Sequence, residues 1–297
     1  MRHLLEIDDL SPVELHAVLD RAEDPEPRPV LAGKGMALVF EKPSARTRNS
    51  MEMAVSQLGG HPVAIRGDEV GLDVREPVED VTRTLACYHA AIGARVFHHS
   101  HVERMAAVGV APIVNLLSDE AHPMQALADL LTIRQEFGRL DVTVAYVGDA
   151  NNVARSLGIA VAMAGGTFRI AAPSGHRFAG PVLDRIAAAG MPVEEFDRPE
   201  PAFEGAHVVY TDVWTSMGQE AELEQRLLAF DGYTISAPML AGLHPDGIFM
   251  HCLPAHRGQE VAAEVVDGSK SRIWRQAENR MHAARGLLWW LMEQKNQ

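Results

Sequence analysis

The pattern of apolar and polar positions changes period repeatedly along the chain, and each change marks a predicted strand or helix. Short apolar runs, typical of buried strands, alternate with longer segments in which apolar residues recur every three or four positions, as in amphipathic helices. The predicted strands are Met36–Phe40, Val63–Ile65, Pro112–Asn115, Val142–Val147, Phe168–Ala172, Val208–Thr211 and Ile248–His251. The predicted helices are one beginning at Ser11-Pro12, then Thr47–Leu58, Pro77–Ala90, Pro123–Phe137, Asn152–Ala164, Val182–Ala189, Glu220–Phe230 and Ser271–Glu293.

This alternation predicts an α/β fold with two domains. Strands that alternate with helices form parallel sheets flanked by helices on both faces. The residue composition first changes along the chain at Gly138-Arg139, which indicates a domain boundary. We therefore expect one domain at residues 1–137, a second at 138–270, and a C-terminal helix within 271–297 that packs back on the first domain.

Composition and charge exclude several classes of protein. The 297 residues are 47% apolar and 23% charged, as in an ordinary globular enzyme. The net charge of −13 argues against partners such as nucleic acid or an anionic membrane. Two cysteines, Cys87 and Cys252, are too few for a disulfide scaffold or a cysteine-rich zinc module and suit a reducing cytoplasm. No apolar run is long enough for a membrane span, and three acids among the first nine residues interrupt any signal-peptide core, so we expect a cytoplasmic protein.

Polar clusters follow five of the predicted strands. In open parallel sheets, ligands bind beyond the carboxyl ends of the strands, so this is where functional side chains are expected. The five clusters are Ser44–Arg48, His122–Gln125, Gly148–Asn152, Asp212–Gly218 and His251–Pro254. Solvated loops alone do not require so many, and the clusters predict a ligand site at the sheet edges.

The cluster Ser44–Arg48 combines the features of an anion site. A hydroxyl, the free amides of a helix N-terminus and two guanidiniums suit the geometry of a phosphate. The alternative is an ordinary helix cap with surface arginines. No P-loop motif is present, and Gly148-Asp149-Ala150 lacks the second and third glycines of a dinucleotide motif, which argues against a nicotinamide-dependent oxidoreductase.

Three further groups leave alternatives open. Asp212 fits either a substrate ammonium or a helix cap. His251-Cys252 fits a nucleophile or a metal pair, but a buried strand end is the simpler interpretation. The run His98–His101 looks like a metal motif, yet no cysteine or carboxylate set completes it at ligand spacing, so no metal site is predicted.

Together these strings resemble the aspartate/ornithine carbamoyltransferase family. The resemblance runs nearly from end to end, from Arg2 to His282. Phe40–Arg48 is similar to the family's carbamoyl-phosphate loop, and His122–Asp129 is similar to its second shared motif. Two other strings resemble those of members that act on ornithine, namely Asp212–Gly218 and His251–Pro254.

The resemblance implies a reaction and an assembly. The reaction is carbamoyl transfer from carbamoyl phosphate to the δ-amine of L-ornithine, which gives citrulline and phosphate and is used in arginine biosynthesis. The resemblance implies no cofactor, no metal and no protein nucleophile. It also implies a homotrimer or a multiple of trimers. The alternative acceptors are putrescine and an N-acylated ornithine. Aspartate would require a basic acceptor pocket, which Asp212 argues against, and a catalytically silent subunit is disfavoured by the intact arginine and His-Pro-x-Gln sets.

The resemblance also assigns roles to individual residues. The carbamoyl-phosphate set is Ser44, Arg46, Thr47, Arg48, Arg95, His122, Gln125 and Arg280. The ornithine set is Asn152, Asp212, Ser216, Met217, Cys252 and Leu253, of which the last two lie where the substrates meet. The catalytic groups would be His122, Cys252 and Arg280. The loop Gly67–Glu76, which reaches a neighbouring subunit in the family, carries Arg75 here.

Overall fold

The computed structural model describes residues 1–215 and 222–295, which form two compact units. Unit 1 comprises Met1–Leu131 and Glu278–Gln297, and unit 2 comprises Thr132–Ala277. The expected boundaries, after residues 137 and 270, lie less than two helical turns from these positions. Among the described residues, no helix is both long and apolar enough to pass through a membrane.

Unit 1 is built on a four-stranded parallel sheet in the order β2-β1-β3-β4. Its strands are β1 (Gly35–Phe40), β2 (His61–Arg66), β3 (His89–Arg95) and β4 (Ile113–Leu117). Phe40 at the end of β1 is paired with Arg95 at the end of β3, which in turn is paired with Leu117 at the end of β4. Consequently the loops that follow β1 and β4 leave the sheet on either side of Arg95.

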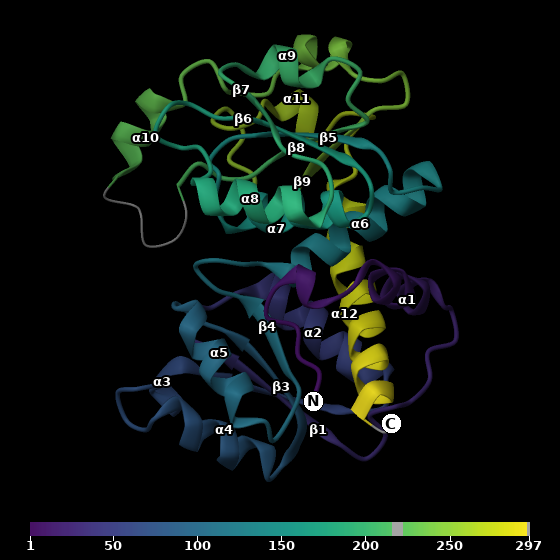
Figure 1. Ribbon diagram of the computed structural model, residues 1–297, viewed down its shortest axis with the longest axis vertical. Coiled ribbons are helices and arrows are strands. Elements are labelled where there is room, and N and C mark those ends of the chain that lie inside the picture. The colour runs from purple at the N-terminus through teal and green to yellow at the C-terminus, as the bar shows by residue number, and fades with distance from the viewer. Residues whose placement is uncertain (216–221, 296–297) are drawn as a thin grey trace. The chain divides into compact units, whose positions relative to one another are not determined.

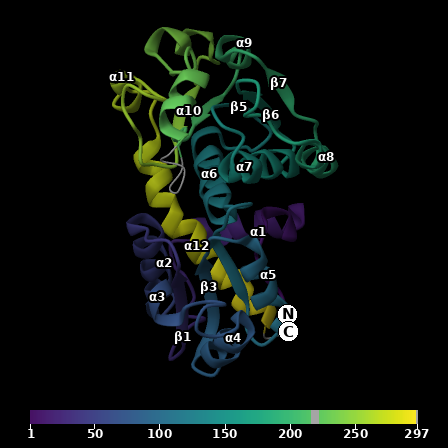
Figure 2. The ribbon, with the colours of Figure 1, turned by 90° about the vertical axis from the view of Figure 1, so that its left-hand side faces the viewer.

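Helices cover both faces of this sheet. They are η1 (Ile7–Asp9), α1 (Pro12–Glu23), α2 (Ala45–Gln57), α3 (Gly67–Val70), α4 (Val78–Ala86), α5 (His99–Val108), the first part of α6 (Pro123–Phe137) and most of α12 (Ile273–Lys295). Figure 2 shows α2 and α5 on opposite sides of β3. The face toward α4 and α5 buries an aliphatic cluster that includes Val39, Ile92 and Val102. Ser11 is the N-cap of α1 and forms a capping box, in which the Ser11 amide donates to the Glu14 carboxylate.

The prediction of one helix from Pro77 to Ala90 was wrong. The helix α4 ends at Ala86, and β3 begins at His89. Val81 and Leu85 are buried as the helical spacing requires, whereas Tyr88 is 72% exposed. The stretch from Ala91 onward is instead buried between β1 and β4, because the centre of a parallel sheet accepts a short apolar run without alternation.

Unit 2 is built on a five-stranded parallel sheet in the order β7-β6-β5-β8-β9. Its strands are β5 (Thr143–Val147), β6 (Thr167–Ala171), β7 (Glu194–Phe196), β8 (Val208–Thr211) and β9 (Ile248–His251). The last residues of three neighbouring strands are in register, since Val147 pairs with Thr211 and Thr211 pairs with His251. The segments that follow these three strands therefore begin side by side.

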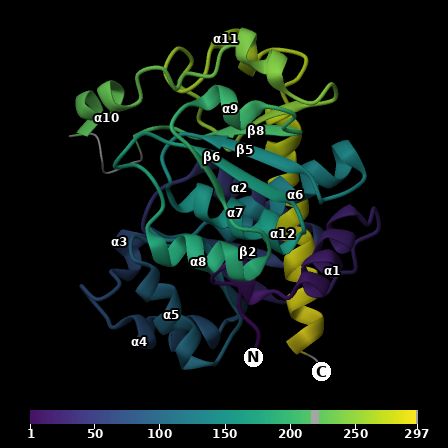
Figure 3. The same cartoon turned by 45° about the horizontal axis from the view of Figure 1, so that its top comes forward.

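The sheet of unit 2 also forms a middle layer. Helices α7 and α8 lie on one face and α9 and α11 on the other (Figures 1 and 3). The helices are α7 (Asn152–Met163), α8 (Gly180–Ala189), α9 (Pro199–Phe203), α10 (Leu223–Ala229), η3 (Ala237–Gly242) and α11 (Ala263–Val266). The predicted helix Glu220–Phe230 corresponds to α10, but its first two residues lie outside the described part of the chain. The two units together confirm the predicted α/β fold with two flanked parallel sheets.

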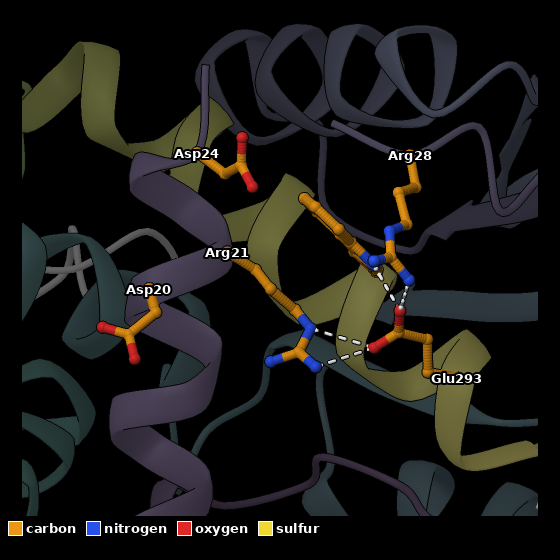
Figure 4. Close-up of a pocket in the computed structure, with 6 residues that line it drawn as sticks. Asp20, Arg21, Asp24, Arg28 and Glu293 are labelled. Atoms are coloured by element: carbon orange, nitrogen blue, oxygen red, sulfur yellow. Dashed lines mark hydrogen bonds and ion pairs between the residues drawn. The ribbon is translucent and has the colours of Figure 1, made fainter. Parts of the chain in front are cut away.

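The C-terminal helix packs within unit 1, as predicted. Arg285 on α12 donates to the Ala22 carbonyl at 2.7 Å, and Arg21 on α1 donates to Glu293 at 2.7 Å. Figure 4 shows Glu293 with Arg21 on one carboxylate oxygen and Arg28 on the other. The indole of Trp289 also donates to Glu293, at 2.8 Å. The shallow pocket at this place is thus lined by ion pairs that join α1 to α12.

The Glu293 contacts predict a pH-dependent contribution to stability. Burial would raise the pKa of Glu293, but bonds from Arg21 and Trp289 and the charges of Arg21 and Arg28 outweigh it and lower the pKa below its ordinary 4.5. A lowered pKa stabilises the folded state above the unfolded-state pKa, and this stability is lost as the pH falls through the folded pKa. We expect Glu293→Gln to lower stability by about 1 kcal/mol at pH 7, because the bonds are partly exposed.

The measurement is the urea midpoint of both proteins from pH 7 downward. The difference between them should be constant to about pH 4.5 and then shrink. A difference that persists unchanged to pH 2 would show that the lost packing, and not the carboxylate charge, causes the effect.

Candidate active site

In unit 1, the ends of three adjacent strands bring the predicted phosphate residues together. Ser44 follows β1 and caps α2, with its hydroxyl accepting from the Thr47 amide at 3.3 Å. Arg95 is the last residue of β3, and His122 follows β4 and precedes α6. Because β1 and β4 flank β3, these three segments meet at one edge of the sheet.

The hydroxyl of Thr47 is the point on which this site converges. Arg280 donates to Thr47 Oγ1 at 2.7 Å, and Arg95 donates to the same oxygen at 3.3 Å. Arg280 also bonds Gln125 Oε1, and the Gln125 amide donates to Asp129 at 2.8 Å. Both arginines are buried: 7% of Arg95 and 8% of Arg280 is exposed to solvent. Their bonds to Thr47 and Gln125 are to neutral oxygens, and they bring two guanidiniums to one hydroxyl.

His122 belongs to the same group and is neutral at neutral pH. Its side chain is buried, with 4% of the residue exposed. Burial, and then the positive charges of Arg280 and Arg95, hold the pKa of His122 well below its ordinary value. A neutral imidazole has one donor and one acceptor nitrogen, so His122 can donate a hydrogen bond to a carbonyl oxygen without adding a third charge.

The other two arginines of the predicted phosphate set point to the surface. Arg46 and Arg48 are exposed in the first turn of α2, and Arg48 forms an ion pair with Glu52 at 2.8 Å. The site therefore contains a buried part around Thr47 and an exposed part at the N-terminus of α2. An anion bound at that terminus would contact free backbone amides and reach both parts.

In unit 2, the segments after β5, β8 and β9 surround the carboxylate of Asp212. This residue is 6% exposed. It accepts hydrogen bonds from Asn151 Nδ2 at 3.0 Å, from the Val213 amide at 2.8 Å and from Cys252 Sγ at 3.0 Å. A carboxylate has about four lone-pair positions, so three donors fix its orientation and leave capacity for one more. Cys252 here is a hydrogen-bond donor to Asp212, which makes it part of this arrangement.

Asn151 lies in the predicted cluster Gly148–Asn152, but the sequence analysis assigned it no individual role. Its Oδ1 accepts from the amides of Val153 and Ala154 and so caps α7, while its Nδ2 holds Asp212. The signal was present, since asparagine directly before a helical pattern is a typical N-cap. Asn152, the predicted ornithine contact, lies next to it in the first turn of α7. The predicted residues Ser216 and Met217 lie outside the described residues.

A buried arginine that the sequence also did not reveal holds the end of β5. Arg226 on α10 donates to Asp149 at 2.7 Å and to the Trp214 carbonyl at 2.9 Å. His176 lies on the other oxygen of Asp149, at 3.2 Å. Arg226 therefore fixes the segment after β8 relative to the segment after β5, beside Asn151 and Asp212.

Asp212, His251 and Cys252 have potential metal-ligand atoms within 4.8 Å of one another, and among the described residues no other such group is found. Both ring nitrogens of His251 already have partners, the Leu253 amide at 2.9 Å and Glu260 at 3.1 Å.

The run His98–His101 is divided by the start of α5. His101 lies between Glu41 and Asp73, at 3.5 and 3.4 Å, and His99 contacts Ser118 at 2.7 Å.

Comparisons with known proteins agree with the two-unit division of chemistry. Residues 2–135 match the carbamoyl-P binding domain of aspartate/ornithine carbamoyltransferases, and residues 140–291 match their Asp/Orn binding domain. The chain is 48% identical to an ornithine carbamoyltransferase of Acidothermus cellulolyticus over 99% of this chain and 97% of the relative.

Solved structures give the same result. The ornithine carbamoyltransferase of Thermus thermophilus superposes with a TM-score of 0.90 at 43% identity, covering 98% of this chain and 99% of that one. The ornithine carbamoyltransferase from Pyrococcus furiosus superposes with a TM-score of 0.92 at 41% identity, covering 97% and 96%. The fold, the strand-end clusters and these matches together establish that the chain belongs to the aspartate/ornithine carbamoyltransferase family.

Proposed function

We propose that this protein transfers the carbamoyl group of carbamoyl phosphate to the δ-amine of L-ornithine, giving L-citrulline and phosphate. The observation that carries the proposal is the convergence of two buried guanidiniums on Thr47, at the N-terminus of α2. The planar guanidinium fork matches the oxygens of a phosphate, so two guanidiniums that converge beside a helix N-terminus suit this anion. The relatives that match over nearly their whole length are named for ornithine, which favours this acceptor over putrescine or an N-acylated ornithine.

The carbamoyl-phosphate half of the mechanism follows from unit 1. Ser44, Arg46, Thr47, Arg48 and Arg95 would hold the phosphate, and Gln125 would hold the carbamoyl amide. When the amine attacks the carbamoyl carbon, negative charge develops on the carbonyl oxygen. Donors from Thr47, neutral His122 and Arg280 would stabilise that charge, and the arginines would stabilise the departing phosphate.

The ornithine half follows from unit 2. Asp212 would pair with the α-ammonium of ornithine, and Asn152, Ser216 and Met217 would contact the rest of the substrate. Cys252 and Leu253 would lie where the substrates meet. An alkyl ammonium has a reference pKa near 10.4, so the site must favour the neutral δ-amine before attack. The departing phosphate would accept the proton that the amine loses, because the Cys252 thiol already carries the proton that it donates to Asp212.

The decisive experiment is a citrulline assay with a panel of amines. Purified protein and carbamoyl phosphate are combined in parallel with L-ornithine, putrescine, N-acetylornithine and aspartate, and each carbamoylated product is measured. We expect ornithine to give the highest kcat/KM. A higher value with another amine would replace the proposed acceptor, and no product with any amine would refute the transferase proposal.

Arg46 provides a test of the exposed part of the phosphate site. A hydrogen bond to a charged group contributes about 1.5–3 kcal/mol, so Arg46→Ala should lower kcat/KM by at least about tenfold. Because Arg46 is exposed, the fold should not change. Arg83→Ala, which removes an exposed arginine that pairs with Asp80 on α4, is the matched control. Equal kinetics for wild type and Arg46→Ala would remove Arg46 from the site.

We further propose a homotrimer, or a multiple of trimers, in the cytoplasm, in which Arg75 reaches a neighbouring site. Arg75 is exposed, and its guanidinium donates to the Glu69 carbonyl of its own loop at 2.9 Å. Val74 beside it is 88% exposed. An exposed cation at the end of a glycine-bearing loop can contact an anion on a second subunit, which supports the proposal.

A mixing experiment tests this sharing. Arg75→Ala and Arg46→Ala subunits, each impaired alone, are mixed under conditions that allow exchange. If Arg75 acts on a neighbour, some mixed trimers contain one site with both arginines, and activity should partly return. No recovery, despite exchange shown by mass spectrometry, would place both arginines in one subunit's site.

A further inference from the structure

Leu253 has a backbone conformation that its side chain disfavours. Its φ is 63°, in the left-handed region where residues other than glycine are strained. Leu253 follows Cys252, whose thiol bonds Asp212, and it is one of the residues proposed to lie where the substrates meet. A strained backbone persists only where its surroundings enforce it, and such positions are frequent at functional sites.

The side chain of His251 supplies the enforcing contact. The Leu253 amide donates to His251 Nδ1 at 2.9 Å. An amide can only donate, so Nδ1 must be the unprotonated nitrogen of the ring. The ring proton is then on Nε2, which lies 3.1 Å from Glu260 Oε1.

Glu260 fixes that tautomer from the far side of the ring. Neither His251 nor Glu260 side chain is exposed to solvent. The same Glu260 oxygen also accepts from the His256 amide at 2.6 Å, which holds the carboxylate in place. The backbone of His251 is fixed separately, because its amide donates to Gln276 at 2.8 Å and Gln276 donates to Tyr210 at 3.0 Å. The pair is therefore held from several sides, and His251 Nδ1 accepts from the Leu253 amide.

We propose that His251 and Glu260 are positioning residues for carbamoyl transfer: Glu260 holds His251 in the Nε2–H tautomer so that Nδ1 keeps Leu253 in its left-handed conformation. This assignment rests on the proposed function, because it takes Leu253 to be at the substrate site. Both residues act through Leu253 and neither contacts a substrate.

The first test uses two variants of His251. They distinguish the loss of the hydrogen-bond acceptor Nδ1 from the loss of the imidazole ring. His251→Ala removes the acceptor, and kcat/KM for ornithine should fall by about tenfold to a hundredfold. Binding of carbamoyl phosphate alone should be unchanged, because its proposed ligands are in unit 1. His251→Asn places an amide oxygen where Nδ1 was, and it should restore much of the loss. Equal kinetics for the alanine and asparagine variants would refute the acceptor role.

The second test is a double-mutant cycle with Leu253→Gly. Glycine adopts a positive φ without strain, so the His251 contact should contribute less to activity and stability in the Leu253→Gly variant. The loss in kcat/KM caused by His251→Ala should shrink by about fivefold or more, and the loss in urea midpoint should shrink with it. Additive effects would mean that His251 is merely structural. The urea cycle needs no substrate, so it gives an answer even if the wild-type assay fails and refutes the proposed function.

A third measurement observes the tautomer of His251 directly and does not depend on activity. The ring nitrogens of His251 are observed by 15N NMR of the full chain, with His251→Asn identifying the signal by its disappearance. We expect a neutral ring that is protonated on Nε2, and Glu260→Gln should keep this tautomer because its amide oxygen can still accept. A proton on Nδ1 would overturn the proposal.

Discussion

Replacing Arg280 with alanine is expected to lower kcat/KM for carbamoyl phosphate by about a hundredfold to a thousandfold. Loss of one donor to a developing oxyanion has an effect of this size. Arg280 bonds both Thr47 and Gln125, so its removal also takes one donor from each of these two oxygens. The measurement is steady-state kinetics at saturating ornithine, together with direct binding of carbamoyl phosphate.

Arg285 on the same helix provides the matched control. It is also buried, at 7% exposure, but it bonds Gln57 and the carbonyls of Ala22 and Asp24. Arg285→Ala should lower the urea midpoint and leave kcat/KM of the folded protein unchanged. Arg280→Lys keeps the charge without the planar fork and should restore activity only in part. A similar loss of kcat/KM in the Arg285 and Arg280 variants would attribute the effect to packing of α12.

Asp212→Asn is expected to lower kcat/KM for ornithine by at least about thirtyfold. Removing one partner of a buried charge pair lowers the binding free energy by about 2 kcal/mol or more. The new amide would also place its NH₂ group against a donor, Asn151 Nδ2 or Cys252 Sγ, which the carboxylate now accepts from. Binding of carbamoyl phosphate measured alone should be unaffected.

Measuring ornithine and carbamoyl phosphate separately distinguishes the possible roles of Asp212. Loss confined to ornithine supports the ammonium contact, whereas equal weakening of both ligands would show that Asp212 is structural. Asp267→Asn is a control in the same unit, because Asp267 is exposed and pairs with Arg257 at 2.8 Å. It should leave both ligands unchanged.

The sequence alone predicted the elements whose signals are local. The helix Pro123–Phe137 and the strands Val208–Thr211 and Ile248–His251 have the predicted bounds. A capping box and a short apolar run depend on neighbours within a few residues, so they can be recognised before the chain folds. Local signals failed at β3, where helical spacing continued into a strand that is specified by its place between β1 and β4.

The sequence by itself also determined which residue types follow the strands, and hence where a ligand site would form. Only the tertiary structure decided which of them meet. Sheet order and register place Thr47 beside Arg95, and α12 brings Arg280 to Thr47 across 233 positions of the chain. The contacts of Asn151 with Asp212 and of Glu260 with His251 likewise join separate segments. The physical reason is that a hydrogen bond requires two groups within about 3 Å, and the distance between remote residues is fixed by packing and not by either local sequence.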